Sequence, residues 1–235
     1  MKNKFYRICL WLGILLTPCL AEAQNYGRIY HAYVGYDFVN TQTVDNWMPF
    51  NLAYPDMKNG LVSIGIDGFA IRNNIMMGGQ LQVKHGPVVR APRGNLRPYI
   101  ADLMAQGGYV FINKKGLMVY STLGVGYGAF ATHIFNTRKR YPDFVPSVPA
   151  IRENVVLIQQ GVVGSLTVGA DYFVANHNTD RSKGFALGLR LGYDARPKSD
   201  KWQASEYDIT GGPSYSASGF FVRLTVGKGT VGPRL

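Results

Sequence analysis

Residues 117–129 read LMVYSTLGVGYGA, and this stretch decides the fold. Its odd-numbered positions carry mostly large apolar side chains, while positions 124, 126 and 128 are glycine. A period of two is typical of a β-strand with one apolar face. Residues 116–137 contain no charged side chain, so a membrane-spanning helix is the alternative. Each glycine would weaken that helix by about 1 kcal/mol relative to alanine, and the glycines share a face only in a strand.

The same alternation recurs along the rest of the chain, in which glycine and tyrosine are frequent and charged residues are few. It predicts eight strands, each bounded by turn residues or loops. We place them at residues 26–39, 60–71, 74–84, 98–112, 116–131, 154–173, 184–195 and 214–227.

Short and long connectors alternate between these predicted strands. The links after strands two, four and six are Arg72-Asn73, residues 113–115 and residues 174–183, whereas the other links are longer and rich in proline. Outer-membrane barrels have short periplasmic turns and long external loops. We therefore expect an all-β fold: a closed antiparallel up-and-down transmembrane β-barrel spanning residues 24–228. Residues 229–235 are then a short periplasmic tail.

The amino-terminal segment has the features of a cleaved signal peptide. Lys2, Lys4 and Arg7 precede an apolar run at residues 8–20, and Ala21-Glu22-Ala23 fits the signal peptidase pattern. Gln24 would then begin the mature chain. The apolar run is too short for a membrane anchor of about 20 residues. A lipoprotein signal ending at Cys19 is the other alternative, which Pro18 disfavours.

The net charge limits the kinds of partner that the chain can have, and the cysteine content limits its chemistry. The net charge of +11 falls to +9 when the signal leaves, and both cysteines, Cys9 and Cys19, leave with it. The mature chain thus has no disulfide and no thiol ligand. Because an exported chain does not meet nucleic acid, we expect anionic lipid headgroups and lipopolysaccharide phosphates as the partners of this charge, and a location in the outer membrane of a Gram-negative cell.

The polar faces of the predicted strands hold small residues and a few charges of both signs. A soluble lipocalin-like periplasmic barrel, the alternative, would carry many more lysines and glutamates on its polar face. We therefore expect the polar face to line the lumen, where buried charges must be paired. The predicted ionic network, interpreted as a structural plug rather than a conducting path, comprises Asp67, Asp102, Asp171, Arg190, Asp194 and Arg223.

In this pattern the chain resembles the small eight-stranded outer-membrane proteins, such as the barrel of outer-membrane protein A and outer-membrane protein X. In that family the last strand carries a signal for the barrel-assembly machinery, and Gly219, Val222, Leu224 and Val226 fit its alternation. The chain departs from the family by ending in a glycine-rich tail and Leu235 instead of an aromatic residue. The resemblance implies a partnership with that machinery during biogenesis.

No enzyme, cofactor or metal site is expected. Some barrels of this size are lipid A enzymes that use a histidine with a serine two residues later, or a loop histidine with an Asp-Ser pair. None of the four histidines at positions 31, 85, 133 and 177 fits the first pattern, and the chain has no Asp-Ser pair. Glycine-rich phosphate loops and paired histidines of metal sites are also missing.

Basic residues in two predicted external loops are the candidate binding residues. Arginine suits bidentate contact with phosphate, so we expect lipopolysaccharide contacts from Lys84, Arg90, Arg93, Arg97, Arg138, Lys139 and Arg140. Solvated loop charge without a ligand is the alternative. The expected role is structural or surface-interacting, in a porin-like barrel. A component of a secretion or conjugation assembly, with an unidentified envelope protein as partner, and a lipid A-modifying enzyme are the competing functions.

Overall fold

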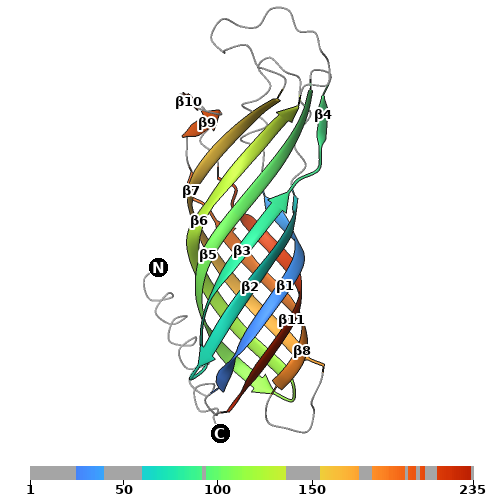
Figure 1. Cartoon of the computed structure of the whole chain (residues 1–235), viewed down its shortest axis with the longest axis vertical. Helices are drawn as coiled ribbons and strands as arrows, with labels where there is room; N and C mark the ends of the chain where they lie inside the picture. Colours follow the sequence, from blue (N-terminus) through green and yellow to red (C-terminus); the bar gives the residue numbers. More distant parts are fainter. Residues whose placement is uncertain are drawn as a thin grey trace, which may run out of the picture.

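A computed structural model describes residues 25–39, 60–91, 94–135, 154–174, 182–198, 201–204, 207–209 and 216–233. Eight long strands form the barrel (Figure 1). They are β1 (Asn25–Val39), β2 (Leu61–Arg72), β3 (Ile75–His85), β5 (Gly94–Lys114), β6 (Leu117–Phe135), β7 (Asn154–Phe173), β8 (Ser182–Ala195) and β11 (Gly219–Pro233). Within these residues no helix is long and apolar enough to span a membrane.

The barrel closes because its first and last strands pair. Each long strand is antiparallel to its sequence neighbours, and β1 pairs with β11 along its whole length, from Asn25 opposite Pro233 to Val39 opposite Gly219. Closure satisfies the hydrogen-bonding groups that an open sheet would leave at its edges. The prediction of a closed, eight-stranded, antiparallel barrel is therefore confirmed.

Tight turns join strands at one end of the barrel. Arg72 pairs with Ile75 across Asn73 and Asn74, and Lys114 pairs with Leu117 across Lys115 and Gly116. All four turn residues have positive φ, the conformation that two-residue hairpins of type I′ require. β1 begins and β11 ends at this same end, hereafter called the short-turn end (Figure 1).

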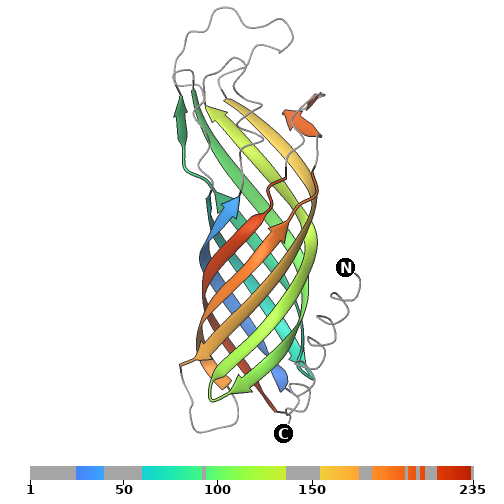
Figure 2. The ribbon, with the colours of Figure 1, turned by 180° about the vertical axis from the view of Figure 1, so that it is seen from behind.

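At the opposite end, hereafter the loop end, three strands rise above the others. The upper parts of β5, β6 and β7 continue beyond the last pairs of β3 and β8 (Figures 1 and 2). Three short strands add to this wall: β4 (Val89–Ala91) pairs with β5, β9 (Trp202–Ala204) pairs with β7, and β10 (Tyr207–Ile209) pairs with β9. None of these short strands was predicted from the sequence.

The observed strands differ from the predicted ranges mainly at their ends. The largest difference is β11, which was predicted at 214–227 and occupies Gly219–Pro233. The expected periplasmic tail is therefore wrong as far as Pro233, because residues 229–233 pair with the start of β1. His85 and His133, expected in loops, lie in β3 and β6.

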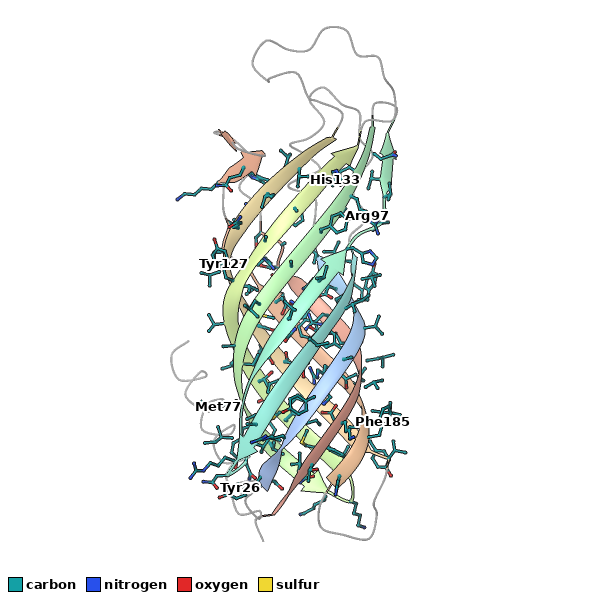
Figure 3. All side chains as sticks on the ribbon, in the orientation of Figure 1. Tyr26, Met77, Arg97, Tyr127, His133 and Phe185 are labelled. Carbon is teal, nitrogen blue, oxygen red and sulfur yellow. The ribbon has the colours of Figure 1, made fainter. Side chains whose placement is uncertain are left out.

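Side chains alternate between the two faces of the wall as the sequence pattern predicts. In β6, Tyr120 and Thr122 are buried in the lumen, while Leu123, Val125 and Tyr127 project outward and are exposed. The stick view shows Tyr127 and Phe185 outside the ribbon (Figure 3). Apolar residues therefore cover the outer surface, which is the surface that a membrane would solvate.

Candidate functional site

The lumen holds a first buried polar cluster around His31 of β1. Its Nδ1 lies 2.8 Å from an Asp67 oxygen, and its Nε2 lies 3.1 Å from an Asp171 oxygen. Arg190 of β8 forms an ion pair with Asp67 and donates a hydrogen bond from Nε to the Tyr120 hydroxyl at 2.7 Å. These residues come from five different strands. The cluster therefore ties opposite walls of the barrel together.

A second cluster lies nearer the loop end. Lys84 of β3 forms ion pairs with Asp37 and Asp194, the latter at 2.6 Å. Arg223 of β11 contacts the same two carboxylates at 3.2 and 3.0 Å, and its guanidinium stacks on the Phe221 ring at 3.5 Å from the centroid. Two cations thus match two carboxylates, which is the pairing that buried charges require.

Amides extend the second cluster, and glycines give the buried carboxylates space. Gln82 donates hydrogen bonds to Asp102 at 2.8 Å and Asp194 at 3.3 Å, while Gln80 donates to the Tyr33 hydroxyl at 2.6 Å. A Cβ atom at Gly188 would collide with the Asp171 carboxylate, and one at Gly128 would collide with that of Asp102. These two glycines therefore provide the space that the carboxylates occupy.

Apolar side chains close the lumen on both sides of the polar clusters. One buried group gathers near the short-turn end and the other near the loop end. The first includes Ile29, Phe69, Met76, Met118 and Phe173; the second includes Leu61, Ile100, Phe130, Leu157 and Trp202. The expectation that small and ionic residues alone fill the lumen is therefore incomplete. In the described part of the chain, apolar layers therefore pack above and below the polar clusters.

All six residues of the predicted lumen network are buried inside the barrel. Arg223 contacts Asp194, whereas Arg190 contacts Asp67, and Asp171 contacts His31 and Thr225 instead of an arginine. Asp102 forms an ion pair with Arg196, which lies just after β8. Sequence reasoning missed His31, Asp37 and Arg196, although the alternation of β1 places His31 and Asp37 on the inner face.

Lys84 corrects the set of predicted lipopolysaccharide contacts. Its side chain is 1% exposed and points into the lumen, because it shares the inward face of β3 with Gln80 and Gln82. Paired with two carboxylates, it is not available to an external phosphate. Of the other candidates, Arg93, Arg138, Lys139 and Arg140 lie outside the described residues, and Arg90 lies in β4.

Arg97 lies on the outer face of β5 near the loop end (Figure 3). Its guanidinium lies 5.2 Å from the centroid of the Tyr99 ring. In the ladder between β5 and β6, Arg97 lies opposite His133. With Tyr36, Val62 and His85 it lines an outer groove of about 340 Å³. The Arg97 Nε is buried and has no hydrogen-bond partner in the described part of the chain.

The outer face of the barrel distinguishes a membrane-spanning barrel from a soluble lipocalin-like barrel. Apolar side chains that are 37–69% exposed occur on all eight long strands. Tyr36, Phe38, Tyr193 and Phe220 cluster near the loop end, where two ring pairs each lie 4.9 Å apart. Phe130 and Phe173 are instead buried inside the barrel. A lipocalin-like barrel would have the reverse orientation, with its apolar face around a ligand.

The buried histidine is the nearest approach to catalytic chemistry in the described residues. His31 and its two carboxylate partners have side chains that are 0% exposed. A substrate from solvent or membrane does not reach them without opening the barrel. Among the residues that the structure describes, no group of three or more histidine, cysteine or acidic side chains is arranged to hold a metal ion.

Comparisons with known proteins give similarity of shape only. No protein-family model matches the chain, and no curated protein matches it. Neisserial surface protein A is 11% identical, with 89% of this chain and 97% of that chain covered and a TM-score of 0.40. Outer membrane protein OprG from Pseudomonas aeruginosa is 10% identical, covering 90% and 98%, with a TM-score of 0.44. Outer membrane protein AlkL is 11% identical, covering 90% of each chain, with a TM-score of 0.35.

Proposed function

We propose that this chain is an integral outer-membrane β-barrel of a Gram-negative cell with a structural or surface-interaction role and no catalytic activity. One observation carries this proposal: the outward positions between the two ends of the wall are apolar or small. In β11, for example, Phe220, Val222, Leu224 and Val226 face outward, and Lys228 follows only at the short-turn end. In β1, the outward side chains from Tyr30 to Phe38 are also apolar or small. Arg28 follows them toward the short-turn end.

The height of the outward apolar band fits the thickness of a membrane. Arg28 and Phe38 are ten residues apart in β1, or about 33 Å along a strand that rises about 3.3 Å per residue. A strand tilt of about 40° reduces this to about 25 Å, the height of the apolar band of outer-membrane barrels. Export by the predicted signal peptide and insertion by the barrel-assembly machinery belong to the same proposal.

Cell fractionation with a heat-modifiability gel tests the location. The chain is expected in the outer-membrane fraction, extracted only by detergent, and its unheated form should migrate differently from the boiled form because the barrel stays folded in the gel. Recovery of a monomeric chain from the periplasm without detergent would overturn the proposal.

Arg97 and the basic loop residues are proposed to contact lipopolysaccharide phosphates. Arg97 supports this because it lies on the outer face near the loop end and lines the outer groove there. The further candidates are Arg90, Arg93, Arg138, Lys139 and Arg140. Since a guanidinium binds phosphate by two parallel hydrogen bonds, arginine positions are expected to dominate the contact.

The measurement is the amount of lipopolysaccharide that co-purifies with the barrel. The variant Arg97→Gln/Arg138→Gln/Lys139→Gln/Arg140→Gln is expected to lose most of it. The variant Lys198→Gln/Lys201→Gln, which removes exposed lysines near the same end, is expected to keep it. Equal retention by both variants contradicts the contact while leaving the membrane location intact.

A further inference from the structure

A groove of about 800 Å³ crosses the outer surface at the short-turn end, far from the external rim. It spans β8, β11, β1 and β2, which are consecutive around the barrel. Each of these strands contributes one cation: Lys183, Lys228, Arg28 and Arg72. Tyr26, at the lower end in Figure 3, also lines it. Four positive side chains therefore meet on one patch of the wall.

Strand register explains why these long side chains border a hollow. Arg28 lies opposite Ala70 on one side and Thr230 on the other, and Thr230 also lies opposite Lys183. Ala70 and Thr230 are too short to fill the space between the cations. The floor of the groove is therefore backbone and small side chains, and the charged groups stand at its edges.

The positive charge of the groove is not neutralised within the described part of the chain. There, no ion pair joins Arg28, Arg72, Lys183 or Lys228 to a carboxylate. The aspartates at positions 37, 67, 102, 171 and 194 are all buried in the lumen and turned away from this surface. Like charges placed side by side on a sheet repel one another, so the patch favours an anion from outside.

Apolar side chains adjoin the cations on the side toward the middle of the barrel. Lys228 lies opposite Tyr30 in β1 and opposite Phe185 in β8. Both aromatic rings are about half exposed, and Figure 3 shows Phe185 on the outer surface. The groove thus combines a cationic edge with an apolar edge, which matches a ligand that has an anionic headgroup and hydrocarbon chains.

We propose that this groove binds the phosphate of a glycerophospholipid in the periplasmic leaflet, with its acyl chains against Tyr30 and Phe185. This inference rests on the proposed function, because the short-turn end faces the periplasm only if the barrel spans the outer membrane. Arg28 and Arg72 supply guanidinium forks for the phosphate oxygens, and the two lysines supply point charges.

Native mass spectrometry tests this site on the folded chain extracted from outer membranes. Phosphatidylglycerol is titrated into micelles of a zwitterionic detergent. The groove variant is Arg28→Gln/Arg72→Gln/Lys183→Gln/Lys228→Gln. The control is Lys114→Gln/Lys115→Gln/Lys198→Gln/Lys201→Gln, which loses the same charge elsewhere. Because the groove variant loses four cations that would lie beside the anionic headgroup, it is expected to bind at least about tenfold more weakly, and the control unchanged.

Each other outcome overturns the proposal. Equal weakening in both variants means unspecific attraction by net charge, and unchanged binding in both means that the groove is not the site. In a parallel titration with lipopolysaccharide, the groove variant and the parent should bind equally well. Weaker lipopolysaccharide binding by the groove variant would assign the groove to lipopolysaccharide instead of a glycerophospholipid. If the chain is absent from the outer-membrane fraction, the lipid titration is not reached, and that result refutes the proposed function itself.

Discussion

Replacing Arg190 by methionine is expected to lower the free energy of unfolding of the barrel by about 3–5 kcal/mol, because it removes the cation from a buried ion pair. Arg190 is buried, forms an ion pair with Asp67 and donates a hydrogen bond to the Tyr120 hydroxyl. Without it, His31 is the one partner left to the Asp67 carboxylate among the described residues. Urea unfolding in lipid vesicles, followed by tryptophan fluorescence, measures the loss.

The variant Arg190→Met/Asp67→Asn distinguishes a broken ion pair from lost packing. It removes both charges, so it should be more stable than Arg190→Met alone even though it carries more changes. The exposed Lys198→Met is the matched control and should change stability by less than about 0.5 kcal/mol. If Arg190→Met costs no more than this control, the lumen network does not stabilise the barrel.

The architecture was predictable because the physical signal for it is repeated along every strand. Each strand alternates large apolar residues with glycine and polar residues, so one slip of register would exchange the two faces. That constraint predicts Asp171, Arg190, Asp194 and Arg223 on the inner face, and all four are buried there.

The partners within the lumen were harder to predict because long side chains reach across the barrel. Arg190 in β8 contacts Asp67 in β2, and Lys84 in β3 contacts Asp194 in β8, although neither strand pair is hydrogen-bonded. The order of strands gives neighbours along the wall and does not give contacts through the interior. The contacts of Asp171 with His31 and Thr225 could therefore not be deduced from the order of strands.

Strand ends were the other source of error. Lys84 was counted with the loop residues because it is the last residue of the predicted strand 74–84. In the structure β3 continues to His85, and Lys84 keeps the inward position that it shares with Gln80 and Gln82. Residues 228–233 lack the large apolar side chains of a typical strand, yet β1 starts at Asn25 and provides a partner for each of them. Here pairing with an available neighbour, rather than local pattern, determines where the strand ends.

The orientation of the apolar face leads to a second large expected effect, at the middle of β11. Leu224 is 62% exposed and lies four residues from both Phe220 and Lys228, so its side chain is expected near the centre of the membrane. An arginine at such a depth costs about 2–4 kcal/mol in outer-membrane barrels. Leu224→Arg is therefore expected to lower the free energy of unfolding in vesicles by about that amount.

Ala195→Arg provides the matched control for depth. Ala195 also faces outward, but it ends β8, beyond Tyr193 and near the loop end, where arginine costs only about 0–1 kcal/mol. A barrel surrounded by lipid should therefore respond strongly to the charge in β11 and weakly to the one in β8. A barrel surrounded by water would tolerate both charges, because replacing a water-exposed leucine by arginine removes no stabilising contact and buries no charge. Equal and small effects of the two substitutions would thus show that lipid does not contact this surface.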